Sequence, residues 1–384
     1  MAGGDDAPSS RRPPRRRARG RAAIGPRCGR VLASRPHRFE VFPVSEGGIN
    51  IEADWQTGPD AVRRQGAALQ APLAELLRRV RRTPPNFVLT CARGSSAHAA
   101  TFGKHLLERH LGIPVGAFAP NVATIYRRRM TLAGQLFLTV SQSGRSDDLI
   151  ESVEMAKAAG ALTAAIVNDG ESPLAKASDI VLPMAAGPEL SVAATKTFVT
   201  SLSAWLHLAA AWADLDDLRA AIERLPDRLA AAMRLDWSAA LQPLCEAKSL
   251  VSLGRGPTLA IAREAALKLK ETSNLHAEAF SSAEFLHGPI ALVESSYPAL
   301  MFVPTDQAAV GLRALAADLR RKNANVFMTG EAEPEGLPAL PPDHPDADAV
   351  CLIQTFYALA IRVAQSRGIN VDLPRHLQKI TRTR

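Results

Sequence analysis

Three charged residues in one short segment are the first candidates for chemistry. Glu264, Lys268 and Glu271 are spaced i, i+4 and i+7, so on a helix they share one face. A row of this kind is usually a set of solvated ion pairs. The residues between them are mostly alanine and leucine, however, which leaves little other polar surface. Two interpretations stay open: an exposed salt-bridge row, or charged side chains that face a cleft.

Two histidines follow this segment. His287 comes directly before Gly288 and Pro289, so we expect it in a loop rather than on an apolar helix face. Nothing in the sequence around His276 distinguishes it from a structural histidine, and we interpret it as one.

Serine-rich turns form a second group of candidates. The sequence Ser-Gln-Ser-Gly-Arg-Ser at 141–146 follows an apolar strand and precedes a helical stretch. Such a turn presents free backbone N–H groups to an anion. One turn alone would be explained by ordinary N-capping by serine. A second turn, Gly94-Ser95-Ser96, follows the preceding strand, and the two together predict a phosphate site.

Other phosphate-binding patterns are not supported. The chain has no GxxxxGK[ST] segment, so no nucleotide-triphosphate loop is predicted. Gly254-Arg255-Gly256 follows a strand, but the third glycine of a dinucleotide fingerprint is missing and no acid stands at the ribose spacing.

The pattern between these candidates predicts the elements that position them. Short apolar strands alternate with helical stretches, which is typical of βαβ units and a parallel sheet. In the first half we predict helices over 60–82 and 192–215 and strands over 87–90, 135–140, 162–167 and 179–183. In the second half we predict strands over 249–253, 298–303 and 325–328 and helices over 258–273 and 350–367.

The two halves share an opening pattern. Each begins with a strand that runs into a glycine-containing turn and a helix, which indicates an internal duplication of an open α/β domain. We place the seam near 225–236, where Pro226 is expected to break the helical pattern.

Composition limits the classes of protein. A chain of 384 residues is expected to form two domains. The net charge of +8 equals eleven arginines minus three acids within residues 1–40, so we expect no specific nucleic-acid surface on the fold. Residues 1–50 are predicted to be a disordered Arg/Pro-rich tail. No apolar run is long enough to predict a membrane span. Four scattered cysteines predict neither a metal site nor disulfides, which suits a cytoplasmic protein.

Six motifs in order resemble the tandem SIS (sugar isomerase) domain family. The resemblance runs from 59 to 379. It is closest to the stand-alone glucosamine-6-phosphate deaminases and to the isomerase half of glutamine:fructose-6-phosphate aminotransferase. The motifs are RGSS (93–96), SQSGRS (141–146), AGPELSVAATKTF (186–198), EAALKLKET (264–272), HAEAFSSAEFLHGP (276–289) and PRHLQK (374–379).

The resemblance implies an α/β fold with two SIS domains, over 58–228 and 236–371. Each would be an open parallel sheet flanked by helices, a flavodoxin-like three-layer sandwich. The C-terminal tail, 372–384, would contribute Lys379 to the site.

The resemblance also implies roles for single residues. Glu271 would be the base that moves a proton between C1 and C2, and Lys268 would support it. His287 would open the pyranose ring, reaching in from the second subunit of a homodimer. Lys379 matches the lysine that forms a Schiff base with the ketose in the synthases. The substrate-binding set would be Ser95, Ser96, Ser141, Gln142, Ser143, Ser146 and Ala193.

The direction of the reaction is inferred from the segment before the first domain. It holds only the arginine-rich tail, and residue 2 is Ala2, so we expect no glutaminase domain to supply ammonia. We therefore expect deamination of glucosamine 6-phosphate to fructose 6-phosphate and ammonia, with no cofactor. A fructosamine-6-phosphate deglycase, a galactosamine-phosphate deaminase, an ammonia-dependent synthase and a sugar-phosphate-sensing regulator remain alternatives.

Overall fold

The computed structural model describes residues 50–331 and 336–379. These residues belong to one compact unit, so the two predicted halves share a core. The predicted tail lies outside the described residues except for Asn50, which begins helix α1. The last five residues of the C-terminal tail lie outside them as well.

The first half is built on a parallel sheet with the order β2-β1-β3-β4-β5. Its strands are short and mostly buried, as expected for strands covered on both faces. They are β1 (Val88–Cys91), β2 (Val115–Ala117), β3 (Leu136–Ser141), β4 (Leu162–Val167) and β5 (Ile180–Pro183).

The second half repeats this sheet. Its order is β10-β9-β8-β6-β7, again all parallel, which is the first order read in the opposite direction. The strands are β6 (Ser249–Gly254), β7 (His276–Ser281), β8 (Pro298–Phe302), β9 (Asn325–Thr329) and β10 (Gly336–Leu337). The shared topology confirms the predicted pair of open α/β sheets, and it agrees with an internal duplication.

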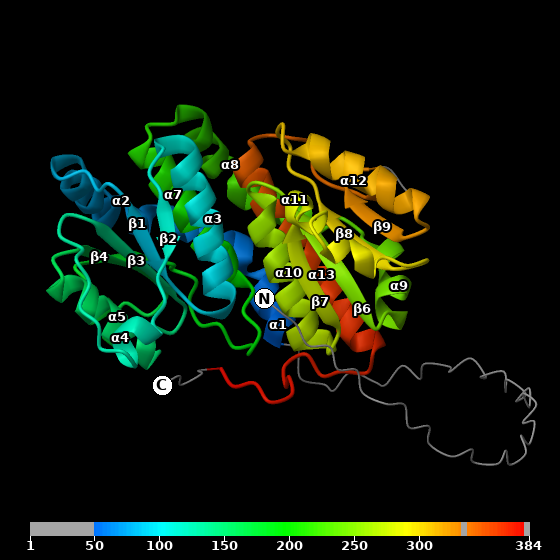
Figure 1. Cartoon of the computed structure of the whole chain (residues 1–384), viewed down its shortest axis with the longest axis horizontal. Coiled ribbons are helices and arrows are strands. Elements are labelled where there is room, and N and C mark those ends of the chain that lie inside the picture. The colour runs from blue at the N-terminus through cyan, green and yellow to red at the C-terminus, as the bar shows by residue number, and fades with distance from the viewer. Residues whose placement is uncertain (1–49, 332–335, 380–384) are drawn as a thin grey trace, which may run out of the picture. The chain divides into compact units, whose positions relative to one another are not determined.

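Helices cover both faces of each sheet (Figure 1). The outer face of the first sheet carries α4 (Asn121–Thr124), α5 (Asp147–Ala158) and α6 (Pro173–Ala177). The outer face of the second carries α11 (Ser282–Phe285) and α12 (Ala309–Arg321). The remaining helices are α1 (Asn50–Gln56), α2 (Gly58–Arg82), α3 (Gly94–Leu111), α7 (Lys196–Trp212), α8 (Asp216–Ala232), α9 (Leu241–Glu246), α10 (Thr258–Ser273) and α13 (Pro345–Ser366), with the short 3₁₀ turns η1 (Ser238–Ala240) and η2 (Pro289–Leu292).

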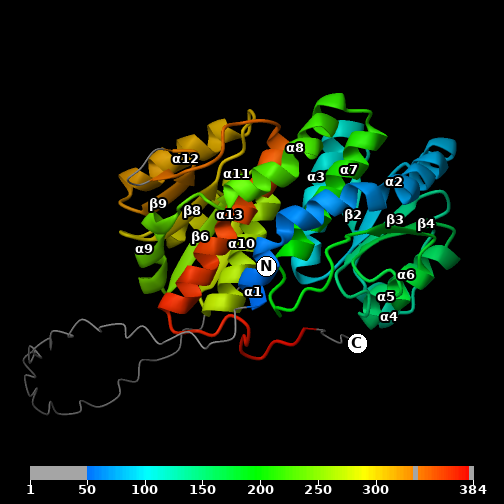
Figure 2. The same cartoon turned by 180° about the vertical axis from the view of Figure 1, so that it is seen from behind.

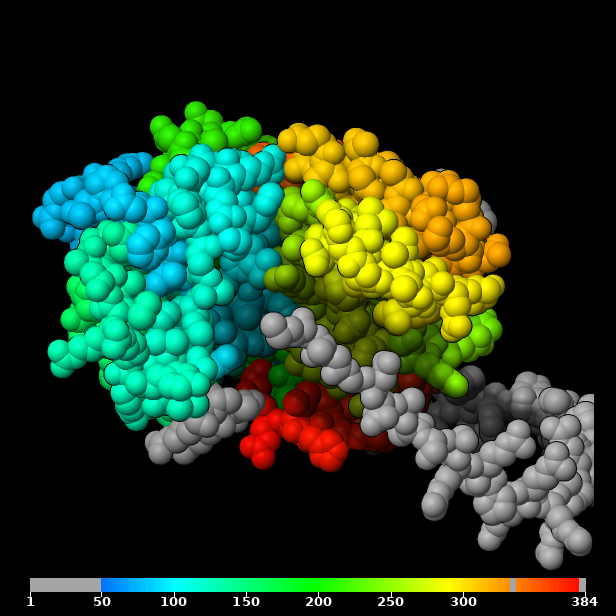
Figure 3. Space-filling view, in the orientation of Figure 1, coloured from blue at the N-terminus to red at the C-terminus, as the bar shows by residue number. Residues whose placement is uncertain are grey.

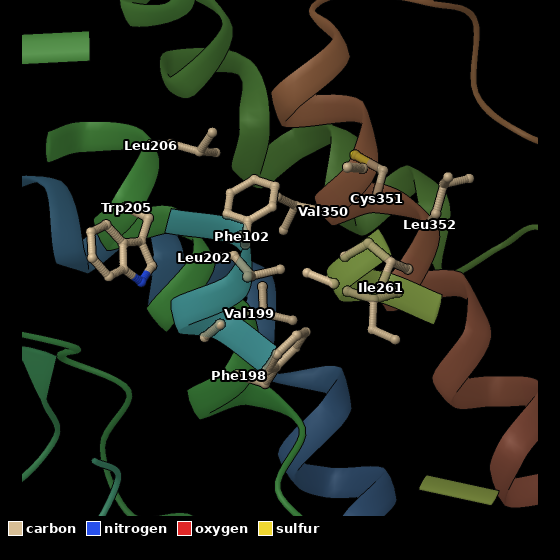
Figure 4. Packing of buried hydrophobic residues seen from close by; sticks show 14 of the residues in the cluster. Phe102, Phe198, Val199, Leu202, Trp205, Leu206, Ile261, Val350, Cys351 and Leu352 are labelled. Atoms are coloured by element: carbon tan, nitrogen blue, oxygen red, sulfur yellow. The ribbon is translucent and has the colours of Figure 1, made fainter. Parts of the chain in front are cut away.

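The largest apolar cluster lies between the two sheets. Helices α2, α3, α7, α8, α10 and α13 pack together there, and the view from behind shows the same layer (Figure 2). The space-filling view is hollowed between the cyan residues of the first half and the yellow residues of the second (Figure 3). Phe102 of α3, Leu202 of α7, Ile261 of α10 and Val350 of α13 meet in this core (Figure 4). The contact between α3 and α10 brings the two halves together at the site.

The prediction that Pro226 breaks the helical pattern is wrong. Pro226 lies inside α8 and does not break it. The ring removes one backbone hydrogen bond, but α8 buries an apolar face that includes Leu218, Leu225 and Leu229, and this burial outweighs the loss. The chain leaves the helix only after Ala232.

Helix α13 is long and apolar enough to cross a membrane by length and composition alone. Within this fold 89% of its most apolar window is buried, as in a core helix, so its length and composition are weak evidence for a membrane span.

Candidate active site

The predicted charged row on α10 faces inward. Lys268 has 1% of its side chain exposed and Glu264 has none, whereas Glu271 keeps 20%. The ammonium of Lys268 lies 3.4 Å from Glu264 and donates a short hydrogen bond to Glu271. The interpretation as an exposed salt-bridge row is therefore wrong, because a solvated row would not bury its central lysine.

The buried charges stabilise one another. Burial alone would raise the pKa of Glu264, but the charge of Lys268 and hydrogen bonds from His98 and Ser95 outweigh burial, and the pKa is lowered. Burial alone would lower the pKa of Lys268, but the carboxylates of Glu264 and Glu271 raise it. The network therefore holds an ionised lysine beside the ionised carboxylate of Glu264.

The two serine turns lie at the point where the order of the first sheet reverses. The turn after β1 leads into α3, and the turn after β3 leads into α5. Strands β1 and β3 are neighbours, so their turns are adjacent at the carboxyl edge of the sheet. Open α/β sheets bind ligands at such switch points, where two helix N-termini direct free N–H groups outward.

The turn after β3 is held in shape by its own residues. The Ser141 hydroxyl accepts a hydrogen bond from Gly144 N at 3.1 Å, and the Ser143 hydroxyl accepts one from Arg145 N at 3.3 Å. Gly144 has φ +62°, and a Cβ there would lie 2.1 Å from the hydroxyl oxygen of Ser172. Only glycine fits at that position.

An ion pair joins the two turns. Arg93, at the N-cap of α3, donates to Asp148 in the first turn of α5, at 2.9 Å through Nε and 2.8 Å through Nη2. Asp148 is buried, whereas about half of the Arg93 side chain is exposed. The guanidinium therefore offsets a carboxylate that would otherwise repel an anion at this helix N-terminus.

The serine turns and the charged row meet where α3 packs against α10. Ser95, in the first turn of α3, contributes to the lowered pKa of Glu264. One helical turn along α3, Nδ1 of His98 lies 2.9 Å from the same carboxylate. The helix that carries Ser95 thus contacts the charged row of the other half through His98.

The segment 186–195 and the C-terminal tail bring another carboxylate and another lysine close to the charged row on α10. Glu189 is buried and accepts hydrogen bonds from the backbone of Thr195 and Thr197 at 2.9 and 3.1 Å. The ammonium of Lys379 lies 3.7 Å from Glu189 and donates to the Ser191 carbonyl at 2.5 Å. Glu189 also acts electrostatically on Lys268.

We call the set Glu189, Glu264, Lys268, Glu271 and Lys379 the acid–lysine cluster. Ala193 is buried beside it, and its carbonyl accepts a hydrogen bond from Ser191.

The other predicted residues make fewer contacts. Within the described residues the side chains of Ser96, Gln142 and Ser146 form no hydrogen bond, although all three lie on the two turns. His287 is exposed after α11 and has no side-chain partner there. The structure of the single chain therefore does not bring His287 to the cluster. His276 is exposed on edge strand β7.

Three residues near the cluster were missed by the sequence analysis. His98 stands one helical turn after Ser95, a spacing that was available as a signal. Glu189 lies inside the 186–198 motif but was not selected. Tyr357 on α13 carried no signal because it lies in an apolar run; it is 1% exposed, and its hydroxyl has no hydrogen-bond partner in the described part of the chain.

Burial and the nearby carboxylates Glu264, Glu189 and Glu271 place the pKa of Tyr357 well above its usual value, so its hydroxyl is protonated.

The arrangement suits acid–base chemistry on an anionic substrate. Residues 50–331 and 336–379 contain no group of three or more His, Cys, Asp or Glu side chains placed to hold a metal ion. Two cavities, of about 500 and 470 Å³, lie in other parts of the molecule.

Comparison with known proteins gives a consistent family. The SIS domain profile matches residues 85–211 and 244–332. Glutamine–fructose-6-phosphate aminotransferase (isomerizing) of Caulobacter vibrioides is 33% identical over 309 residues, which is 75% of this chain and 50% of that protein. The enzyme of the same name from Thermotoga maritima is 31% identical over 311 residues, 76% of this chain and 50% of that protein. The chain thus spans about half the length of the curated relatives it matches.

Solved structures agree. A suggested phosphosugar isomerase from Silicibacter pomeroyi DSS-3 has 43% identity and a TM-score of 0.81, covering 85% of this chain and 100% of that one. The C-terminal domain of glucosamine-fructose-6-phosphate aminotransferase from Francisella tularensis has 26% identity and a TM-score of 0.75, covering 86% and 100%. Glucosamine-6-phosphate deaminase from Thermotoga maritima shares the fold, with 23% identity, a TM-score of 0.66 and coverage of 85% and 100%.

Proposed function

The chain belongs to the SIS domain family, and we propose that it is a sugar-phosphate isomerase-type enzyme that deaminates glucosamine 6-phosphate. Two relatives named above carry names that refer to fructose 6-phosphate and isomerisation, and one solved structure is named for phosphosugars. These names support a sugar phosphate as the substrate class. The direction of the reaction is the part of this proposal that the assay below tests.

One observation carries the proposal. A buried lysine lies between two carboxylates on α10, and one of those carboxylates contacts His98 on α3, one helical turn after a serine of the turn pair. Burying charges is costly unless they are paired and hydrogen-bonded, and residues with strongly perturbed titration gather at functional sites. These charges lie beside the edge of the sheet that is assigned to bind an anion, so they are placed to act on a bound sugar phosphate.

Exposure separates the roles of the two carboxylates. Glu271 keeps 20% of its side chain accessible, so a substrate carbon can approach it, whereas Glu264 has none. We assign Glu271 as the base that takes the proton from C2 and returns it to C1. Lys268 holds the Glu271 side chain in place through a hydrogen bond, and Glu264 pairs with Lys268.

The serine turns are assigned to the phosphate. Hydroxyls and free N–H groups at the first turns of α3 and α5 give an anion neutral donors, and each charge-assisted hydrogen bond contributes about 1.5–3 kcal/mol. Binding of the phosphate at these turns would hold the sugar so that its C1 and C2 reach Glu271 on α10 of the second half.

Proton transfer from C2 to C1 turns the open-chain amino sugar into an imine at C2. Water adds to that carbon, the C–N bond breaks and ammonia leaves, so glucosamine 6-phosphate and water give fructose 6-phosphate and ammonia. Lys379 is assigned to accept the carbon as a transient Schiff base or to position the water. Its ammonium lies 3.7 Å from Glu189, a carboxylate that can hold a proton during the exchange.

His287 is assigned to ring opening from a partner subunit. Its exposed position in the single chain fits a side chain that completes the site of a second copy. A homodimer and a cytoplasmic location belong to this proposal. Mixing inactive Glu271→Gln chains with inactive His287→Asn chains tests it, because shared sites would recover part of the activity after subunit exchange.

The test of the proposed function is ammonia release from a panel of phosphorylated sugars. The panel holds glucosamine 6-phosphate, galactosamine 6-phosphate and fructosamine 6-phosphate. We expect the first to react fastest, and the paired change Ser141→Ala with Ser143→Ala to raise its KM about tenfold or more.

The alternatives appear as other patterns in the same assay. Faster ammonia release from galactosamine 6-phosphate would indicate that the substrate is the galacto epimer. An amino acid released from fructosamine 6-phosphate would indicate a deglycase. Net synthesis from fructose 6-phosphate and ammonia indicates a synthase. Binding without turnover of any member indicates a regulator and contradicts the proposal.

A further inference from the structure

A second potential binding site lies at the carboxyl edge of the second sheet. A cavity of about 500 Å³ is bounded there by the turn after β8, by α12 and by the start of α13. This volume is within the range of small-molecule sites, and this edge is where open α/β sheets bind ligands. Its polar lining residues are Arg228, Thr305, Asp306, Arg313, Thr329 and Asp348. We propose that this cavity binds a small anionic metabolite, separately from the serine turns.

The turn after β8 is the counterpart of the serine turn after β3. Gly94 and Gly256 both have positive φ in the turns that precede α3 and α10. Cys91 lies three residues before Gly94 and pairs with Thr139 on the neighbouring strand β3. Leu253 lies three residues before Gly256 and pairs with Met301 on the neighbouring strand β8. Ser143 follows Thr139 by four residues and Thr305 follows Met301 by four residues, so Thr305 occupies the position in the second half that Ser143 occupies in the first.

The second turn, however, is already occupied by an anion of the chain itself. Asp306 accepts a hydrogen bond from Ala308 N at 2.9 Å, directly before the first turn of α12. Thr305 donates its hydroxyl to Asp348 at 2.7 Å. The phosphate-binding mode of the first half is therefore blocked here, and a ligand of this cavity has to bind through side chains.

Two arginines supply that binding. Arg313 lines the cavity and forms no hydrogen bond or ion pair within the described residues. Arg228 uses Nη2 for Asp348 at 2.7 Å and for the Pro341 carbonyl at 2.8 Å, but its Nε is buried without a hydrogen-bond partner. Nε lies 3.8 Å from Asp343, too far for a hydrogen bond. A buried N–H of this kind is costly unless a ligand oxygen or a water accepts from it.

The acids of the cavity wall do not cancel these charges. Asp348 is engaged by Arg228, by Thr305 and by the backbone N–H of Asp343. Asp306 lies 3.4 Å from Arg109 of α3 in addition to its bond to the turn. Asp348 is therefore neutralised by Arg228 within the cavity wall and Asp306 is paired with Arg109 outside it, so the guanidinium of Arg313 remains as an unbalanced positive charge. This charge selects a phosphate or a carboxylate.

The test is calorimetric titration of the full chain with fructose 6-phosphate. We expect two binding events per chain in the wild type. The pair Ser141→Ala with Ser143→Ala should weaken one, and Arg313→Ala should raise the Kd of the other about tenfold or more. Arg321→Ala is the matched control: it removes an arginine from the same helix, exposed and outside the cavity, and should leave both events intact. Arg313→Lys should restore part of the affinity.

Further titrations separate the ligand chemistries. Inorganic phosphate and citrate are the other probes. The probe whose Kd rises most on Arg313→Ala identifies whether the site prefers a sugar phosphate, free phosphate or a carboxylate. Binding that depends on Arg313 but not on the serines would support this site and contradict the phosphate assignment of the proposed function. If none of the three probes shows binding that Arg313→Ala weakens and Arg321→Ala spares, the proposed site is wrong.

Discussion

Replacing Lys268 by methionine tests the buried network most sharply. Methionine keeps most of the volume of the side chain but removes the ammonium that lies 3.4 Å from Glu264. Glu264 has no exposed surface, so the change leaves a buried carboxylate with only His98 as a hydrogen-bond partner. Removing one member of a buried ion pair costs about 3–5 kcal/mol of unfolding free energy. We expect Lys268→Met to lose an amount in this range near pH 7.5.

The loss should depend on pH with a definite sign. In the wild type the pKa of Glu264 is lowered below its ordinary 4.5, so its contribution to stability is present above that value and is lost as the pH falls through the folded pKa. Without Lys268 the burial effect dominates and the carboxyl takes up a proton more readily. The difference between wild type and variant should therefore narrow as the pH falls toward 4.5.

Urea unfolding at pH 7.5 and pH 5 measures both effects. The double change Glu264→Gln with Lys268→Met removes both charges and should recover most of the loss. Glu271→Gln is the control, because it leaves Lys268 paired with Glu264. A deficit below about 1 kcal/mol for Lys268→Met, or one that does not change with pH, would refute a buried ionised pair.

Two further predictions concern the core around the site. Gly103→Ala would place a Cβ 2.2 Å from the ring of Trp205, so we expect the melting temperature to fall, with an overpacking cost of about 1–3 kcal/mol; an unchanged value would mean that the ring has another position. Tyr357→Phe removes a buried hydroxyl that has no partner, so the unfolding free energy should stay within about 1 kcal/mol of the wild type or rise. A loss above about 2 kcal/mol would reveal a hydrogen bond to a buried water or to the cluster.

Much of the fold could be predicted because its strands are apolar runs covered on both faces. The predicted strand 162–167 and helix 258–273 match β4 and α10 residue for residue. Three of the four edge strands of the described sheets were missed for physical reasons. β2 has three residues, β10 has two, and β7 is polar at alternate positions because it lies at the end of its sheet. Polar His276 and Glu278 alternate with Ala277 and Ala279, and this short alternation was the available signal for β7.

The site was predictable only in part. Spacing placed Glu264, Lys268 and Glu271 on one face, but it could not decide whether that face was buried. The decision comes from the packing of α3 against α10, which joins residues more than 160 positions apart in the chain, as His98 and Glu264 show. The roles assigned to single residues remain predictions.

The central claim is that Glu271 transfers the proton at C2, and one measurement tests it directly. Glu271→Gln keeps the shape and the hydrogen-bonding capacity of the side chain but removes its basicity. Ammonia release from glucosamine 6-phosphate and exchange of the C2 hydrogen with solvent deuterium are followed together, with calorimetric binding of the sugar phosphate as the control. We predict that both rates fall by roughly 10²–10⁴-fold while binding is retained. Near-normal ammonia release and C2 exchange in Glu271→Gln would show that the carboxylate is structural and would contradict the mechanism.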